Sequence, residues 1–83
     1  MTAALVTGGA GFIGSALVHH LVLELGWQVV TVDKLTYAGR MENLAPVLGH
    51  ANHRFVRADI ADRGAMRRAF AEARPEAVFH LAA

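Results

Sequence analysis

The chain has 83 residues, which is enough for one small domain. Hydrophobic residues make up 54% of it, a content that excludes a disordered chain and favours a buried sheet. The net charge of +1 gives none of the electrostatic footprint that a nucleic-acid or membrane partner requires, so we expect neither partner. The sequence has no cysteine, which excludes disulfides, thiolate metal sites and cysteine nucleophiles. This composition fits a reducing compartment, and we expect a cytoplasmic protein.

The first half of the sequence predicts a strand, a helix and a second strand. Ala3–Thr7 is an apolar run of the kind found in parallel strands that are covered on both faces. Gly11–Leu25 carries apolar residues at helical spacing, and Gly26 is expected to end that helix. Gln28–Val32 is rich in β-branched residues and predicts a second strand that leads into Asp33.

The second half repeats this alternation. After a loop, a short helix is expected over Met41–Leu48, interrupted by Pro46. The remaining elements expected are a strand over Arg54–Ala58, a helix over Asp62–Ala73 and a strand over Ala77–Leu81.

This order predicts an α/β fold, specifically a partial Rossmann fold with a parallel sheet of about four strands and flanking helices. The chain closes on Ala82-Ala83 directly after an apolar strand, which would leave a bare sheet edge. We therefore expect residues 1–83 to be the N-terminal part of an NAD(P)-binding Rossmann domain, with the substrate-binding and catalytic part absent.

A glycine-rich turn joins the first strand to the first helix. Gly8, Gly11 and Gly14 fit the pattern G-x-x-G-x-x-G. Small residues allow a sharp turn, a close approach of a diphosphate to the backbone, and tight packing of the helix on the sheet. The amides near Phe12 and Ile13, at the positive end of the helix dipole, are expected to meet that anion. The alternative is a tight strand–helix turn with no ligand, and the strand–helix context favours the dinucleotide.

An acidic residue stands where the adenosine ribose would lie. Asp33 ends the second strand, 19 residues after Gly14. A carboxylate there accepts hydrogen bonds from ribose hydroxyls and repels a 2′-phosphate, which favours NAD. Lys34 and Arg40 argue in the opposite direction, because a nearby basic residue can accommodate the phosphate of NADP.

These motifs resemble those of the extended short-chain dehydrogenase/reductase family. TGGAGFIG, residues 7–14, resembles its N-terminal fingerprint, and HLAA, residues 80–83, resembles its next landmark. DKLTYAG, residues 33–39, with the following Met41–Leu44, resembles a group within that family, the dTDP-glucose 4,6-dehydratases. The resemblance covers the whole chain but only about a quarter of the usual length of such an enzyme.

The resemblance implies a role for each matching position. Phe12 and Ile13 would lie against the diphosphate, and Asp59 and Ile60 would border the adenine. The stretch from Asp33 through Lys34 and Leu35 to Thr36 would hold the ribose and its surroundings, and Leu81, Ala82 and Ala83 would pass close to the dinucleotide further along.

The resemblance also implies a hydro-lyase with NAD as an internal redox cofactor, a nucleotide-sugar substrate and a homodimeric full-length enzyme. The family's catalytic Tyr-x-x-x-Lys lies downstream of this sequence. Tyr37 is not that tyrosine, because Met41 stands where lysine would be, so no catalytic residue is expected here. A nucleotide-sugar 4-epimerase of the same family and a non-catalytic NAD-binding module remain as alternatives.

Overall fold

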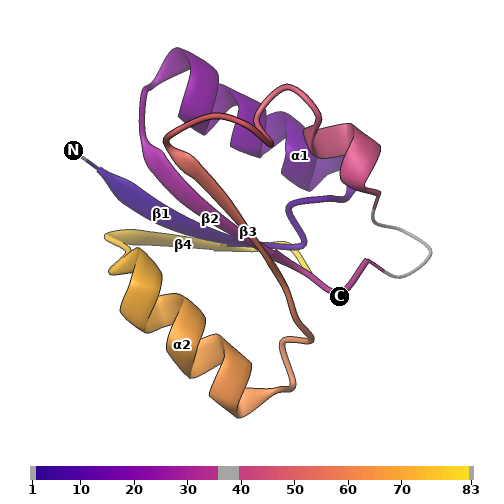
Figure 1. The fold of residues 1–83 in the computed structure, drawn as a ribbon, viewed down its shortest axis with the longest axis vertical. Helices are drawn as coiled ribbons and strands as arrows, with labels where there is room; N and C mark the ends of the chain where they lie inside the picture. Colours follow the sequence, from indigo (N-terminus) through magenta and orange to yellow (C-terminus); the bar gives the residue numbers. More distant parts are fainter. Residues whose placement is uncertain (1, 36–39, 83) are drawn as a thin grey trace.

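The computed structural model describes residues 2–35 and 40–82. Four parallel strands form one sheet in the order β3-β2-β1-β4. In chain order the elements are β1 (Ala3–Thr7), α1 (Phe12–His19), η1 (His20–Glu24), β2 (Gln28–Asp33), η2 (Met41–Leu44), β3 (His53–Arg57), α2 (Arg63–Ala73) and β4 (Ala77–His80). Helix α1 and η2 lie on one face of the sheet and α2 lies on the other (Figure 1). The predicted α/β fold with a parallel four-stranded sheet is therefore confirmed.

The two central strands are buried on both faces, as their unbroken apolar sequences predict. On the side of α1, Ala4 and Val6 of β1 pack with Val18 and Val22 in the larger part of the core. On the side of α2, Leu5 packs with Val30, Val32 and Ala69. The outer strands β3 and β4 have no fully buried residue, and each has only one neighbouring strand among the described residues. In β4 partly buried and exposed residues alternate, as expected where one face is better covered than the other.

The first helix differs from its prediction over Gly11–Leu25. It is α-helical only over Phe12–His19 and continues as a π-helical turn over His20–Glu24. The Leu25 amide donates to the His20 carbonyl at 3.1 Å, a five-residue step that widens the last turn. Gly26 ends the helix as predicted, with a left-handed φ of +69°.

The expected helix over Met41–Leu48 was wrong in its second half. Only Met41–Leu44 forms a regular turn, of the 3-10 type, and consecutive turns follow it. Pro46 has no amide to continue the hydrogen-bond ladder, and the amides of Val47 and Leu48 both donate back to the Leu44 carbonyl.

The other element boundaries moved by one residue. β3 starts at His53 instead of Arg54, because His53 still pairs with Val29 of β2. α2 starts at Arg63, and Asp62 caps it by accepting the Ala65 amide at 3.0 Å. β4 ends at His80, although the next amide, that of Leu81, still donates to the Thr7 carbonyl at 3.0 Å.

A threonine–histidine pair links β2 and β3 beneath the glycine turn. Thr31 is fully buried, and its Oγ1 lies 2.8 Å from Nε2 of His53. Among residues 2–35 and 40–82, buried Nδ1 of His53 has no hydrogen-bond partner, and burial lowers the pKa of this imidazole below its usual 6.5. The Val47 carbonyl opposes that shift without reaching hydrogen-bond geometry, whereas His50 and His19 add to it.

The lowered pKa of His53 makes the stability of the fold sensitive to acid. Below about pH 6.5 the unfolded chain takes up this proton before the folded one does, so the free energy of unfolding falls as the pH falls from 6.5 toward the folded-state pKa. Thermal unfolding at pH 8.0 and pH 5.5 should show a smaller loss of stability for His53→Gln than for the unsubstituted chain. Equal losses in the two proteins would contradict this assignment.

Candidate dinucleotide site

The glycine-rich turn lies where β1 ends and α1 begins. The Gly8 amide donates to the Val32 carbonyl at 2.8 Å, which fixes the turn to β2 as well as β1. Gly11 stands at the N-cap of α1, and having no side chain it makes no capping hydrogen bond to the first helical amides. Those amides have no acceptor within the helix either, so they are positioned to bind an anion.

Three glycines in and beside this turn are required by close approaches. Gly8 has a left-handed φ of +74°, and a Cβ atom there would lie 2.7 Å from the Ala82 amide nitrogen. A Cβ at Gly9 would overlap the Thr31 methyl group, and one at Gly14 would overlap the Gly8 carbonyl oxygen. The tight turn and the close packing of α1 that the sequence predicted are both present.

Asp33 joins the end of β2 to this turn. Its Oδ2 accepts the Ala10 amide at 2.9 Å, and its Oδ1 accepts the Leu35 amide at 2.8 Å. Each carboxylate oxygen can accept more than one hydrogen bond, so acceptor capacity remains for the hydroxyls of a ribose. The predicted ribose acceptor and the predicted phosphate amides therefore lie close together, at the carboxyl ends of neighbouring parallel strands.

Asn43 supports the glycine turn through the Ala10 carbonyl. The sequence did not predict this role. Its side-chain amide donates to the Ala10 carbonyl at 2.8 Å, and the Arg40 amide donates to the same oxygen at 3.1 Å. The carbonyl of Asn43 in turn lies 2.8 Å from Nε2 of His19 on α1. The sequence contains no periodicity or spacing signal for these contacts, because each of them joins residues more than 20 positions apart.

The segment after β3 passes beside Asp33. The Ala58 amide donates to the Asp33 carbonyl at 3.2 Å. Asp59 accepts the Ala61 amide at 2.9 Å through Oδ1, and its Oδ2 lies 3.1 Å from the Lys34 ammonium. The Ala61 amide, followed by Lys34, holds the pKa of Asp59 below its usual range. Ile60 is half-buried next to this pair.

The end of β4 lies on the other side of the turn. The Ala82 amide approaches Oγ1 of Thr7 at 3.4 Å, and the same hydroxyl lies 2.7 Å from Nδ1 of His80. Leu81 and Ala82 therefore border the glycine turn. Thr36 and Ala83, the other two residues predicted for the site, lie outside the described residues.

Two large apolar side chains stand exposed at the start of α1. Phe12 is 87% exposed and Ile13 is 73% exposed, although both lie next to the buried Gly14. They are the first two residues of α1, directly after the glycine turn.

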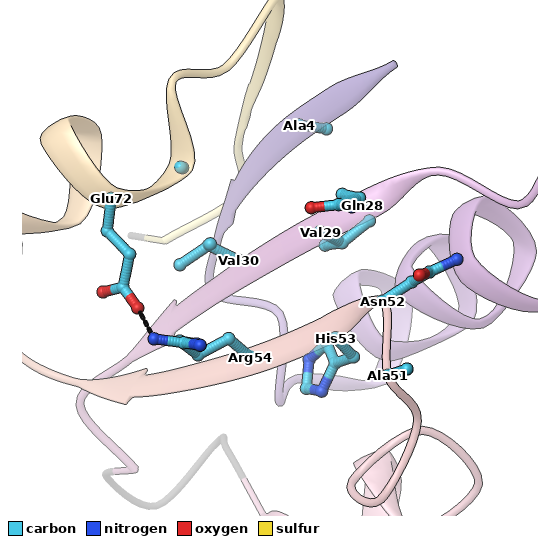
Figure 2. A pocket seen from close by; sticks show the side chains of 10 residues that line it. Ala4, Gln28, Val29, Val30, Ala51, Asn52, His53, Arg54 and Glu72 are labelled. Atoms are coloured by element: carbon cyan, nitrogen blue, oxygen red, sulfur yellow. Dashed lines mark hydrogen bonds and ion pairs between the residues drawn. The ribbon is translucent and has the colours of Figure 1, made fainter. Parts of the chain in front are cut away.

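A separate hollow of about 160 Å³ lies around the amino ends of β2 and β3. Figure 2 shows Arg54 of β3 and Glu72 of α2 pointing toward each other across it, and these side chains form an ion pair. The glycine turn lies at the opposite, carboxyl ends of the strands, so this hollow does not belong to the predicted site.

Residues 4–83 match the sequence profile of the NAD dependent epimerase/dehydratase family. The chain belongs to this family. Among its curated members, the dTDP-glucose 4,6-dehydratase of Shigella flexneri is 57% identical over 79 residues, which cover 95% of this chain and 22% of that protein. The corresponding protein of Neisseria meningitidis is 54% identical over the same extents. The chain thus spans about a fifth of the length of the curated relatives it matches.

Solved structures of family members superpose closely. The dTDP-glucose 4,6-dehydratase of Bacillus anthracis in complex with NAD gives a TM-score of 0.93 at 32% identity, covering 100% of this chain and 27% of that one. The UDP-glucose 4-epimerase of Thermus thermophilus, also with NAD, gives 0.81 at 44% identity, covering 96% and 24%. The two branches of the family therefore share this fold.

The part of the chain that the structure describes has neither a membrane-spanning helix nor a cluster of metal-binding side chains. None of its helices has both the length and the apolar character that crossing a membrane would need. Its histidine, aspartate and glutamate side chains form no group of three that could hold a metal ion.

Two glycine-to-alanine substitutions form a matched pair, one beside the glycine turn and one in α2. Gly14→Ala should destabilise the fold by about 1–3 kcal/mol, because the new methyl group would overlap the Gly8 carbonyl. Gly64→Ala should stabilise it by up to about 1 kcal/mol, because its methyl group meets only ordinary contacts and alanine favours the helix. Chemical denaturation of both variants measures the two signs, and a stabilising Gly14→Ala would contradict the packing described.

Proposed function

We propose that residues 1–83 form the N-terminal part of an NAD-binding Rossmann domain. The main support is the bond between the Asp33 carboxylate and the Ala10 amide, because it brings a ribose acceptor to the turn that presents free amides. In this proposal Gly8, Gly11 and Gly14 allow the diphosphate to approach, and Phe12 and Ile13 lie against it. Asp33 binds the ribose hydroxyls, and Lys34, Leu35 and Thr36 form the surroundings of the ribose. The adenine is bordered by Asp59 and Ile60, and Leu81, Ala82 and Ala83 line the path beyond.

NAD is favoured over NADP by the charges around the ribose. Asp33 would repel a 2′-phosphate, whereas it accepts hydrogen bonds from ribose hydroxyls. Lys34, which argued for NADP in the sequence, is paired with Asp59 at 3.1 Å. The solved dehydratase and epimerase structures that superpose on the chain contain NAD, which supports the same choice.

For the whole protein we propose the activity of a dTDP-glucose 4,6-dehydratase, a hydro-lyase that forms dTDP-4-keto-6-deoxyglucose. Bound NAD would take hydride from the sugar C4 and return it to C6 after water is lost. The role of the present residues is to bind and orient the dinucleotide, and none of them is assigned a catalytic step. Identities of 57% and 54% to named dehydratases support this choice.

A nucleotide-sugar 4-epimerase is the second candidate. The epimerase of Thermus thermophilus is 44% identical to the chain, so the shared fold does not separate the two activities. In either case the substrate would be a nucleotide sugar. By the same family resemblance the full-length protein would be a homodimer, and we propose a cytoplasmic location, which the lack of cysteine in these 83 residues fits.

Asp33→Ala should weaken NAD binding by about 1–3 kcal/mol, the scale of a hydrogen bond to a charged group. Asp62→Ala is the matched control, because Asp62 also accepts a backbone amide but does so at the start of α2. Calorimetric titration with NAD should show the loss only for Asp33→Ala, with circular dichroism confirming that both variants fold. An unchanged dissociation constant for Asp33→Ala would remove this residue from the site.

Two chimeras test the activity. The chain replaces the matching 79 residues of the Shigella flexneri dehydratase in one chimera, and the matching segment of the Thermus thermophilus epimerase in the other. The dehydratase chimera should retain bound NAD and most of its host's activity, and the epimerase chimera should retain less. The reverse order would favour the epimerase, and a folded dehydratase chimera without NAD would contradict the proposed function.

A further inference from the structure

Lys34 is the basic residue closest in sequence to the predicted ribose acceptor, and the structure shows it engaged elsewhere. Its ammonium nitrogen lies 3.1 Å from Oδ2 of Asp59, and the two side chains are 60% and 42% exposed. A free lysine directly after Asp33 would be available to a 2′-phosphate, which carries about two negative charges near neutral pH. The pairing with Asp59 therefore bears directly on which dinucleotide the chain accepts.

Asp59 is the anchored member of the pair. Its Oδ1 accepts the Ala61 amide at 2.9 Å, and its carbonyl accepts the Asp62 amide at 2.9 Å. These bonds fix the carboxylate on its own turn and leave Oδ2 for the lysine. Lys34 has the long, flexible side chain of the two, so the position of Asp59 determines where the ammonium group is held.

The backbone brings both residues to one side of Asp33. Leu35 has a left-handed φ of +59°, and its amide bonds to Asp33, so the chain turns sharply directly after Lys34. On the neighbouring strand, Asp33 pairs with Arg57, and the Ala58 amide donates to the Asp33 carbonyl at 3.2 Å. Asp59 therefore lies near the predicted ribose acceptor Asp33, at the carboxyl ends of β2 and β3.

We propose that the Lys34–Asp59 ion pair is a determinant of dinucleotide selectivity, in which Asp59 withholds Lys34 from the 2′ position of the adenosine ribose and so disfavours NADP. This inference rests on the proposed NAD site and adds a second selectivity element to Asp33. Asp33 repels the phosphate, and Asp59 removes one of the cations that could offset this repulsion, the one adjacent to Asp33 in the sequence.

The pair is partly exposed, so its effect is moderate. Exposed ion pairs are weakened by solvent and by salt, and their strength corresponds to a change of about two- to fivefold in a binding ratio. The effect should be largest at low ionic strength. Other charged side chains at this edge are those of Arg57 and Arg40, both exposed.

The test is the ratio of the dissociation constants for NADP and NAD, measured by calorimetry at low salt. It is measured on the 83-residue chain and on the dehydratase chimera. Asp59→Asn should lower this ratio about two- to fivefold, because the freed lysine can reach the phosphate. The double variant Lys34→Met/Asp59→Asn should return the ratio to that of the unsubstituted protein or higher. Asp62→Asn, which removes a nearby charge that has no lysine partner in the structure described, should leave the ratio unchanged.

Each outcome decides one question. An unchanged ratio in Asp59→Asn would overturn the proposal. A lowered ratio that persists in the double variant would also overturn it, because the gain would then come from removing the Asp59 charge and not from Lys34. Failure of the unsubstituted chain and the unsubstituted chimera to bind either dinucleotide would instead contradict the proposed function.

Discussion

The hydrogen bond from the Ala10 amide to the Asp33 carboxylate is the constraint on which the candidate site depends. It joins the turn after β1 to the end of β2 at 2.9 Å and so holds the two predicted halves of a dinucleotide site next to each other. The Ala10 carbonyl is held from the other side by Asn43 and by the Arg40 backbone. The glycine turn is thus held by the end of β2 and by the segment after β2 that contains Arg40 and Asn43.

Glycine makes this arrangement possible. The turn passes so close to Thr31, to Ala82 and to its own helix that a Cβ atom would overlap or crowd each neighbour. The Thr31 side chain lies 2.8 Å from the His53 side chain of β3. The residues packed beneath the glycine turn therefore connect β1, β2 and β3. Residues that contact no ligand in the proposal therefore still determine whether the turn can form.

The sequence was sufficient to predict the fold because the signals for strands and helices are local in the chain. Unbroken apolar runs predicted the two buried strands, and the spacing from Gly14 to Asp33 predicted that both would border one crevice. It could not predict the π-helical turn after His19, which depends on how the helix end packs, or the end of η2 at Leu44. The contacts of Asn43, and the pairing of Lys34 with Asp59, join segments that only the folded sheet brings together.

The most direct test of the dinucleotide site is a ¹⁵N-resolved NMR titration of the chain with NAD. The account predicts that the largest amide shifts occur at Ala10, Phe12, Ile13 and Leu35, at the carboxyl ends of β1 and β2. The amides of Asn52, His53 and Arg54, beside the hollow at the amino ends of β2 and β3, should change little. Shifts concentrated at that hollow, or no saturable shifts at the glycine turn, would contradict the account.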